Sequence, residues 1–259
     1  GDVVMTRAAT HAAGPYEVDN VRVDVIGTYT NNPVGGAMRG FGTPQAAYPI
    51  EVVLDEIAGI LNIDPIEIRM RNALESGKRT GAGQILNQSV GLKDCIQQAR
   101  NAAEWEKVKG RQKNGDSWKR GIGIAVAYKN VGLGNASQED KSMARVSLED
   151  DGRILIRAGA AEIGQGMTTI LRQFVAETLR MDYEEVDILT GDTFETPDSG
   201  VSSASRQTFV TGNAVIRAAK DVKDQILQAA SSFLDVPVDL LVFDGGRVVV
   251  EGINNRSIS

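Results

Sequence analysis

The sequence has 259 residues, which at roughly 150 residues per domain allows one large domain or two smaller ones. Apolar residues make up 42% and charged residues 24%, which excludes a disordered or collagen-like chain. With 28 basic against 34 acidic residues, the chain has no excess of positive charge that would favour binding to nucleic acid. The longest apolar run is far shorter than the roughly 20 residues that span a bilayer, and no signal pattern begins the chain, so we expect a cytoplasmic protein.

Cysteine and histidine are too scarce for several kinds of site. Cys95 is the single cysteine, which excludes an internal disulfide, a zinc site of paired cysteines and a cysteine-held iron-sulfur cluster within this chain. His11, the single histidine, lies in a polar segment without a nucleophile turn, which disfavours a Ser-His-Asp triad. Chemistry must therefore come from carboxylates, amides, arginines, backbone N–H groups or a bound cofactor.

The first elements are a strand and two helices. Residues 16–29 alternate between apolar and polar side chains, which predicts a half-buried strand. A long irregular loop follows, of the kind that often carries function. Apolar residues then recur at helical spacing over 45–61. A second helix is predicted to begin after Asp64, because Asp64 can cap it, Pro65 suits its first position and Glu67 can reach back to the cap.

The remaining elements follow a polar stretch at residues 76–91. This stretch predicts a linker, which gives one domain of residues 1–79 and another of residues 80–259. Helices are predicted at 92–108, after Gly166, and at 205–233. Strands are predicted at 121–128, 144–148, 154–158, 186–189, 240–243 and 248–250. Glycine turns at 150–152 and 244–246 predict hairpins.

A weak internal repeat indicates that one structural unit is used twice. A shift of 55 residues places Leu179 on Leu234, Met181 on Val236 and Val186 on Leu241, preserving a helix, a turn and a strand. Strands that alternate with long helices, with hairpins among them, predict an α+β fold in which helices cover mixed sheets.

Three loops of small residues are candidates for binding. Residues 161–166 and 199–206 each precede a predicted helix, whose first N–H groups are unpaired and carry partial positive charge. Their glycines and serines would let a phosphate or a pterin edge approach closely, and Arg206 would add a full charge. The third loop, residues 38–42, holds an arginine and an aromatic ring between glycines.

Each loop also has an ordinary structural interpretation. Gly164 and Gly166 suit a strand-to-helix turn, the serines suit a helix cap, and Arg39 suits a surface salt bridge. Glu162 is a candidate general base, although a glutamate beside a turn is more often solvated or a cap. Neither of the common glycine-rich nucleotide motifs occurs in the chain.

Taken together, the loops resemble the large, molybdenum-binding subunit of the xanthine dehydrogenase family of molybdenum hydroxylases. The similar segments are the arginine-glycine-phenylalanine-glycine signature, the helix after it, the glutamate-x-glycine-glutamine-glycine loop and the serine loop: 37–45, 64–72, 162–166, 191–193 and 202–208. The family's upstream metal-lining loops and its glycine-glutamate pair with the catalytic glutamate are absent. We therefore expect an internal fragment that is inactive in isolation.

The resemblance implies the fold of molybdopterin-binding domains and a molybdenum held by a molybdopterin, often in its cytosine dinucleotide form. It implies hydroxylation of a carbon of an N-heterocycle or aldehyde, with water as the oxygen source. Arg39 and Phe41 would take part in catalysis at the metal end of the site, and no side chain would ligate the metal. The implied cofactor-binding residues are Gly40, Gly42, Gly164, Gln165, Gly166, Ser202, Ser203, Ala204 and Ser205. The implied partners are an iron-sulfur subunit, an FAD subunit, the rest of the molybdenum subunit and a small-molecule substrate.

Two other functions remain open at this point. The first is a noncatalytic module that binds a pterin cofactor, which would not need Arg39 and Phe41 near a reacting carbon. The second is a serine hydrolase using Ser203 or Ser205, which is disfavoured because His11 is remote in sequence and no second histidine exists.

Overall fold

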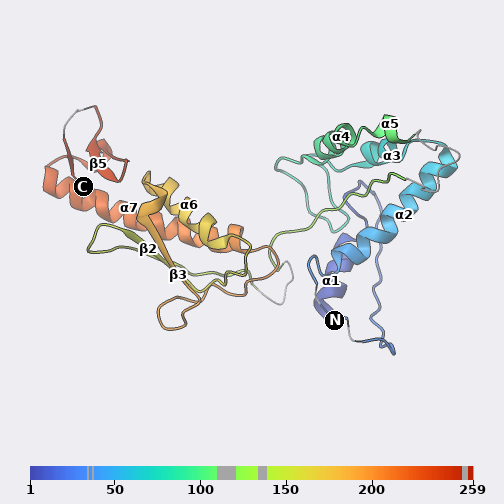
Figure 1. The fold of residues 1–259 in the computed structure, drawn as a ribbon, viewed down its shortest axis with the longest axis horizontal. Coiled ribbons are helices and arrows are strands. Elements are labelled where there is room, and N and C mark those ends of the chain that lie inside the picture. The colour runs from blue at the N-terminus through green and yellow to red at the C-terminus, as the bar shows by residue number, and fades with distance from the viewer. Residues whose placement is uncertain (34, 37, 110–120, 134–138, 253–255, 259) are drawn as a thin grey trace. The chain divides into compact units, whose positions relative to one another are not determined.

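The computed structural model describes residues 1–33, 35–36, 38–109, 121–133, 139–252 and 256–258. The chain forms two compact units, unit 1 of Gly1–Lys129 and unit 2 of Asn130–Ser259 (Figure 1). The domain boundary predicted after residue 79 lies within unit 1 and stays a prediction. Ala37, which belongs to the first predicted loop, lies outside the described residues. In the described part of the chain, no helix is both long and apolar enough to cross a membrane.

Unit 1 is built from helices and extended segments. Its helices are α1 (Asp2–His11), α2 (Thr43–Leu61), α3 (Pro65–Asn72), α4 (Leu92–Ala102) and α5 (Trp105–Lys109). The structure confirms the helix predicted over 45–61. Helix α1 was not predicted, because the residues it buries most deeply are polar, Arg7 and His11, and apolar periodicity does not reveal such a helix.

The start of α3 follows the predicted chemistry. Asp64 Oδ1 accepts a hydrogen bond of 2.7 Å from the N–H of Ile66, and Pro65 is the first helical residue. Glu67 accepts instead from Arg71 Nε at 2.7 Å. The helix predicted over 92–108 is interrupted between α4 and α5, where Glu104 has a φ of 47°.

The strands predicted at 16–29 and 121–128 do not form. The first segment makes one isolated bridge, Tyr16 to Ala73, and its valines are 37–45% exposed. In the second segment, Ile122 and its alternate neighbours pack against a buried cluster. Alternation therefore marks the inward-facing side chains in the second segment only. A strand also needs a hydrogen-bonded partner, and no described segment supplies one.

Unit 2 has a mixed sheet covered by two helices, as predicted (Figure 1). The sheet has the order β1-β2-β3, from Arg145–Leu148, Ile154–Ala158 and Val186–Thr190. Strand β1 is antiparallel to β2, and β2 is parallel to β3. Helices α6 (Met167–Leu179) and α7 (Gly212–Leu234) share one apolar core with this sheet. The structure thus confirms the α+β class.

A second sheet lies in the C-terminal part of unit 2. Strands β4 (Leu241–Asp244), β5 (Arg247–Val250) and β6 (Ser257–Ile258) form an antiparallel sheet. Gly245 and Gly246 have positive φ in the turn between β4 and β5, as a tight hairpin requires.

The repeat of 55 residues is visible in the backbone of unit 2. Helix α6 ends at left-handed Arg180 and α7 at left-handed Asp235. A single 3₁₀ turn follows each, η1 (Tyr183–Glu185) and η3 (Val238–Leu240), and leads into β3 and β4. The helix ends, the 3₁₀ turns and the first residues of the strands are each 55 positions apart.

Candidate functional site

Two of the predicted loops begin at the same edge of the first sheet of unit 2. Strands β2 and β3 are parallel neighbours, and Ala158 at the end of β2 pairs with Thr190 at the end of β3. The first loop runs from β2 to α6, and the second from β3 through a π-helical turn, η2 (Gln207–Thr211), to α7. Ligands of such sheets bind at the carboxyl ends of the strands, so the topology itself brings the two loops together.

Direct hydrogen bonds join the two loops. Ser202 Oγ accepts from the N–H of Ala161 at 2.8 Å and from Gln207 Nε2 at 2.9 Å. The N–H of Gly159 also donates to the carbonyl of Pro197 at 3.1 Å. Ser202 therefore ties the turn before α6 to the start of α7.

Glu162 occupies the N-terminus of α6, which corrects the expectation of unpaired N–H groups there. Its Oε1 accepts from the N–H groups of Gly164 at 2.8 Å and Gly166 at 3.0 Å. Its Oε2 accepts from the N–H of Thr168 at 3.0 Å and from the hydroxyl of Thr168 at 3.3 Å. These bonds, led by that from the Thr168 N–H, lower the pKa of Glu162 to about 2. Glu162 is therefore a capping carboxylate and not a poised general base.

Gln165 is folded into its own turn. Its Oε1 accepts from the N–H of Ile163 at 2.7 Å, and its Nε2 donates to the carbonyl of Ala161 at 2.9 Å. Gly164 and Gly166 have φ values of 96° and 79°. A Cβ atom at either glycine would meet nothing within 4 Å, so a ligand can approach the outer side of this turn.

The serine loop contains two non-glycine residues in the left-handed region. Ala204 has a φ of 55° and Ser205 a φ of 56°, a conformation that costs about 1–3 kcal/mol per residue and needs support from its surroundings. Ala204 is buried, whereas Ser203 and Ser205 are exposed. The two serines are therefore accessible on a loop whose backbone shape is imposed.

Arg206 supports the serine loop from within, which corrects the expectation that it adds a free charge. Its side chain is 1% exposed and pairs with Asp140 Oδ1 at 3.0 Å. The guanidinium donates to the carbonyls of Ser199 at 2.7 Å and Val201 at 3.0 Å, and also to that of Lys141. Its donors are thus directed to the protein itself.

The third loop lies in unit 1, at the start of α2. Arg39 is exposed and Phe41 is half-buried. Arg7 Cζ and Lys129 Nζ each lie over the Phe41 ring, 5.5 Å from its centroid, in cation–π contacts that no local pattern in the sequence indicates. Because the two units are described separately, the convergence of this loop with the loops of unit 2 stays a prediction.

Gly42 fixes the packing of this loop on α1. It has a φ of 114°, and an added Cβ would lie 2.1 Å from the carbonyl oxygen of Val4. We expect Gly42→Ala to lower the free energy of unfolding of unit 1 by about 2 kcal/mol, since backbone cannot yield as a side chain can. Gly59→Ala, in α2 with nothing within 4 Å, is expected to raise it by up to about 1 kcal/mol. Denaturant titrations of both variants check this, and equal midpoints would contradict it.

His11 has a structural place on α1. It is 3% exposed, its Nδ1 lies 2.8 Å from the carbonyl oxygen of Arg7, and its ring centroid lies 4.9 Å from that of Tyr128. Burial lowers its pKa below the ordinary value. These contacts give His11 a packing role within unit 1. Ser203 and Ser205, the candidate nucleophiles of a serine hydrolase, belong to unit 2.

The described residues contain no group of three or more His, Cys, Asp or Glu side chains that could hold a metal ion. Cys95 is free and exposed.

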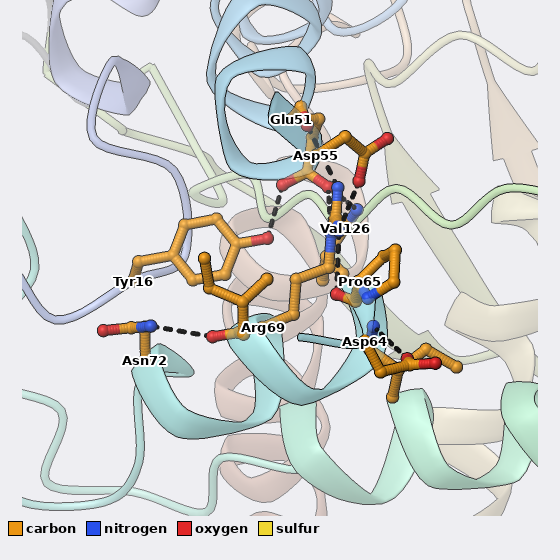
Figure 2. Close-up of polar contacts among 10 residues, drawn as sticks. Tyr16, Glu51, Asp55, Asp64, Pro65, Arg69, Asn72 and Val126 are labelled. Atoms are coloured by element: carbon orange, nitrogen blue, oxygen red, sulfur yellow. Dashed lines mark hydrogen bonds and ion pairs between the residues drawn. The ribbon is translucent and has the colours of Figure 1, made fainter. Parts of the chain in front are cut away.

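Unit 1 also contains a buried ionic network that sequence reasoning missed (Figure 2). Arg69 of α3, with a side chain that is 0% exposed, bonds Glu51 of α2 at 2.7 Å and Asp55 at 2.8 Å. Glu51 accepts further bonds from the hydroxyl of Tyr16 and from the N–H of Val126 at 2.9 Å. One carboxylate thus connects four separate segments of unit 1.

The fold is α+β, and its two joined loops lead into helices beyond one edge of the sheet, the edge at which ligands of open α/β sheets bind. Two family models match the chain, both described as molybdopterin cofactor-binding domain, over residues 1–73 and 98–259. The chain therefore belongs to the molybdopterin cofactor-binding domain family.

Two relatives illustrate the similarity in sequence. The putative xanthine dehydrogenase molybdenum-binding subunit of Escherichia coli K12 is 37% identical over 86% of this chain and 30% of its own length. A probable xanthine dehydrogenase subunit of Bacillus subtilis is 34% identical over 93% of this chain and 32% of its own. The chain thus spans about a third of the length of each of these two curated relatives.

Solved structures share the fold. Quinoline 2-oxidoreductase from Pseudomonas putida 86 matches 99% of this chain and 34% of its own with a TM-score of 0.85, at 24% identity. An aldehyde oxidoreductase from Desulfovibrio desulfuricans matches 86% of this chain and 25% of its own with a TM-score of 0.70, at 30% identity.

Proposed function

We propose that this chain is the molybdopterin-binding portion of an oxidoreductase that hydroxylates a carbon of an N-heterocycle or an aldehyde, with water as the oxygen source. The observation that carries the proposal is the junction of the 161–166 turn with the serine loop through Ser202, in a chain of this family. Relatives named for xanthine, nicotinate, quinoline and aldehydes support the two substrate classes.

The residues present fit a molybdopterin. Its dithiolene sulfurs would hold the metal, so the proposal assigns no side chain of this chain as a metal ligand. The open space above Gly164 and Gly166 leaves room for a flat ring system to lie against the backbone. Ser203 and Ser205 offer exposed hydroxyl groups on the serine loop, which Ser202 joins to this turn. When bound, the molybdenum cofactor supplies the oxidation-reduction chemistry.

The chain's own groups bind and orient in this proposal. Gln165, with the backbone of Gly164 and Gly166, would bond the pterin, and residues 202–205 would bond it through hydroxyl and backbone N–H groups. Gly40 and Gly42 would allow close approach in the loop of unit 1. Arg39 and Phe41 would lie at the reacting end, where Phe41 favours a planar substrate.

The proposed enzyme requires partners. Electrons would leave through an iron-sulfur subunit and an FAD subunit, and the site would be completed by the rest of the molybdenum subunit, without which the isolated chain is inactive. The exposed free thiol of Cys95 suits a reducing compartment, which supports a cytoplasmic location.

Replacement of Gln165 tests cofactor binding. In the complete molybdenum subunit, Gln165→Ala is expected to lower the molybdenum and pterin content about tenfold, whereas loss of the hydrogen bonds within the turn would cost only about 1 kcal/mol of stability each. Metal analysis and pterin fluorescence of the purified subunit measure this. The control is Gln173→Ala, an exposed glutamine on α6.

Three outcomes of this experiment differ in meaning. Equal molybdenum content in Gln165→Ala and wild type would contradict the assigned role of Gln165. A wild-type subunit that holds no pterin would contradict the proposed function. Full cofactor content with no turnover in the assembled enzyme would favour the noncatalytic cofactor-binding module.

A further inference from the structure

The negatively charged group at the N-terminus of α6 belongs to a residue that precedes the helix. The N-cap residue is Gly166, which has no side chain, and the carboxylate that faces the first N–H groups belongs to Glu162. All four of its hydrogen bonds go to Gly164, Gly166 and Thr168. A single side chain thus holds both glycines of the turn and the first turn of the helix at once.

The two neighbours of Glu162 anchor Gln165 and Ser202, the side chains that the proposed function assigns to the cofactor. Ile163 donates its N–H to Gln165, and Ala161 accepts from Gln165 through its carbonyl. The N–H of Ala161 bonds Ser202, which anchors the serine loop. Displacement of Glu162 would therefore move the anchors of both Gln165 and Ser202.

We propose that Glu162 is a positioning residue of the cofactor site: its carboxylate holds the 161–166 turn in the one shape that presents Gln165 and Ser202 together to a pterin. This inference rests on the proposed function. Glu162 does not itself touch the cofactor, because both of its oxygens are directed at the turn and the helix. Its role is to fix loop geometry before the ligand binds.

The titration of Glu162 agrees with this geometry. Its pKa of about 2 lies below the ordinary value of 4.5, chiefly because of the bond from the Thr168 N–H. A lowered folded-state pKa means that the ionised form stabilises the turn above about pH 4.5, and that this contribution is lost as the pH falls towards 2. The carboxylate is thus charged at neutral pH.

The first test measures the turn without any cofactor. In the full chain, Glu162→Gln is expected to accelerate amide hydrogen exchange of Gly164, Gly166 and Thr168 about tenfold, since an amide group accepts fewer of these bonds than a carboxylate. The matched control is Glu177→Gln, an exposed glutamate later in α6, which should leave these rates unchanged. Unchanged rates in Glu162→Gln would overturn the proposal.

The second test separates positioning from simple capping by a double-mutant cycle on cofactor content. Glu162→Gln in the complete subunit is expected to lower molybdenum content about tenfold, together with a small fall in melting temperature from the loss of the helix cap. Glu162→Gln combined with Gln165→Ala should lose less than the sum of the two single losses, because Glu162 acts partly through Gln165 and partly through Ser202. Additive losses, or full cofactor content in Glu162→Gln, would reduce Glu162 to a helix cap.

The two tests fail in distinguishable ways. A wild-type subunit without molybdenum would contradict the proposed function, and with it the positioning role. Amide exchange in the same chain would still show whether Glu162 holds the turn. Normal cofactor binding in wild type and in Glu162→Gln would leave the proposed function standing and overturn this inference alone.

Discussion

Replacement of Arg69 by alanine is expected to lower the free energy of unfolding of unit 1 by about 3–5 kcal/mol. The guanidinium is fully buried between α2 and α3, and it bonds Glu51, Asp55 and the carbonyl of Pro65 at 2.7–2.8 Å. Without it, Glu51, which is 5% exposed, would keep a buried negative charge with only the Tyr16 hydroxyl and the Val126 N–H as donors. An uncompensated buried charge is among the most costly single defects in a folded protein.

Arg71 provides a matched control on the same helix. Its ion pair with Glu67 has the same 2.7 Å length, but the two side chains are 62% and 46% exposed, so Arg71→Ala should cost only about 0.3–0.5 kcal/mol. Trp105 is buried in unit 1, so the change in its fluorescence during urea unfolding reports this unit. Similar midpoints for the two variants would show that burial of the Arg69 network contributes nothing.

The elements that could be predicted are those whose signals are local. Asp64 and Pro65 specify the start of α3 by adjacent chemistry, and the repeat shows in apolar positions 55 residues apart because both copies bury the same face. The predicted strands at 16–29 and 121–128 did not form, because alternation describes one segment, whereas a sheet also depends on a second one. Helix α1 could not be predicted from apolar periodicity, because its buried residues, Arg7 and His11, are polar.

The same difference between local and long-range signals applies to the candidate site. Its small-residue loops could be found in the sequence, since glycine and serine before a helix are visible as residue types. The partners of Glu162 and Arg206 could not, because the same glutamate or arginine is a surface charge unless the fold surrounds it with N–H or carbonyl groups. Likewise, Arg69 and Glu51 are 18 positions apart, and nothing in the sequence indicates that both are buried.

Replacement of Arg206 by alanine is expected to destabilise unit 2 by about 3–5 kcal/mol and to disorder the serine loop. The side chain bonds the carbonyls of Ser199, Val201 and Lys141 and pairs with Asp140. These bonds offset the strain of Ala204 and Ser205 in the left-handed region. Removal of the guanidinium would leave the buried carbonyl of Ser199 and the partly buried carbonyls of Val201 and Lys141 without these donors, and the loop would then relax toward ordinary backbone angles.

Two further variants separate the geometry of the Arg206 guanidinium from its charge. Arg206→Lys keeps the charge. A single ammonium group cannot reach all of the acceptors that the planar guanidinium bonds, so most of the loss in stability should persist. Arg217→Ala, an exposed arginine of α7, should change the free energy of unfolding by less than about 0.5 kcal/mol. Calorimetry gives the stabilities, and hydrogen exchange over residues 199–206 reports the loop. If the lysine variant matched wild type in both measurements, charge alone would suffice, and the directed bonds to the carbonyls would not be what shapes the loop.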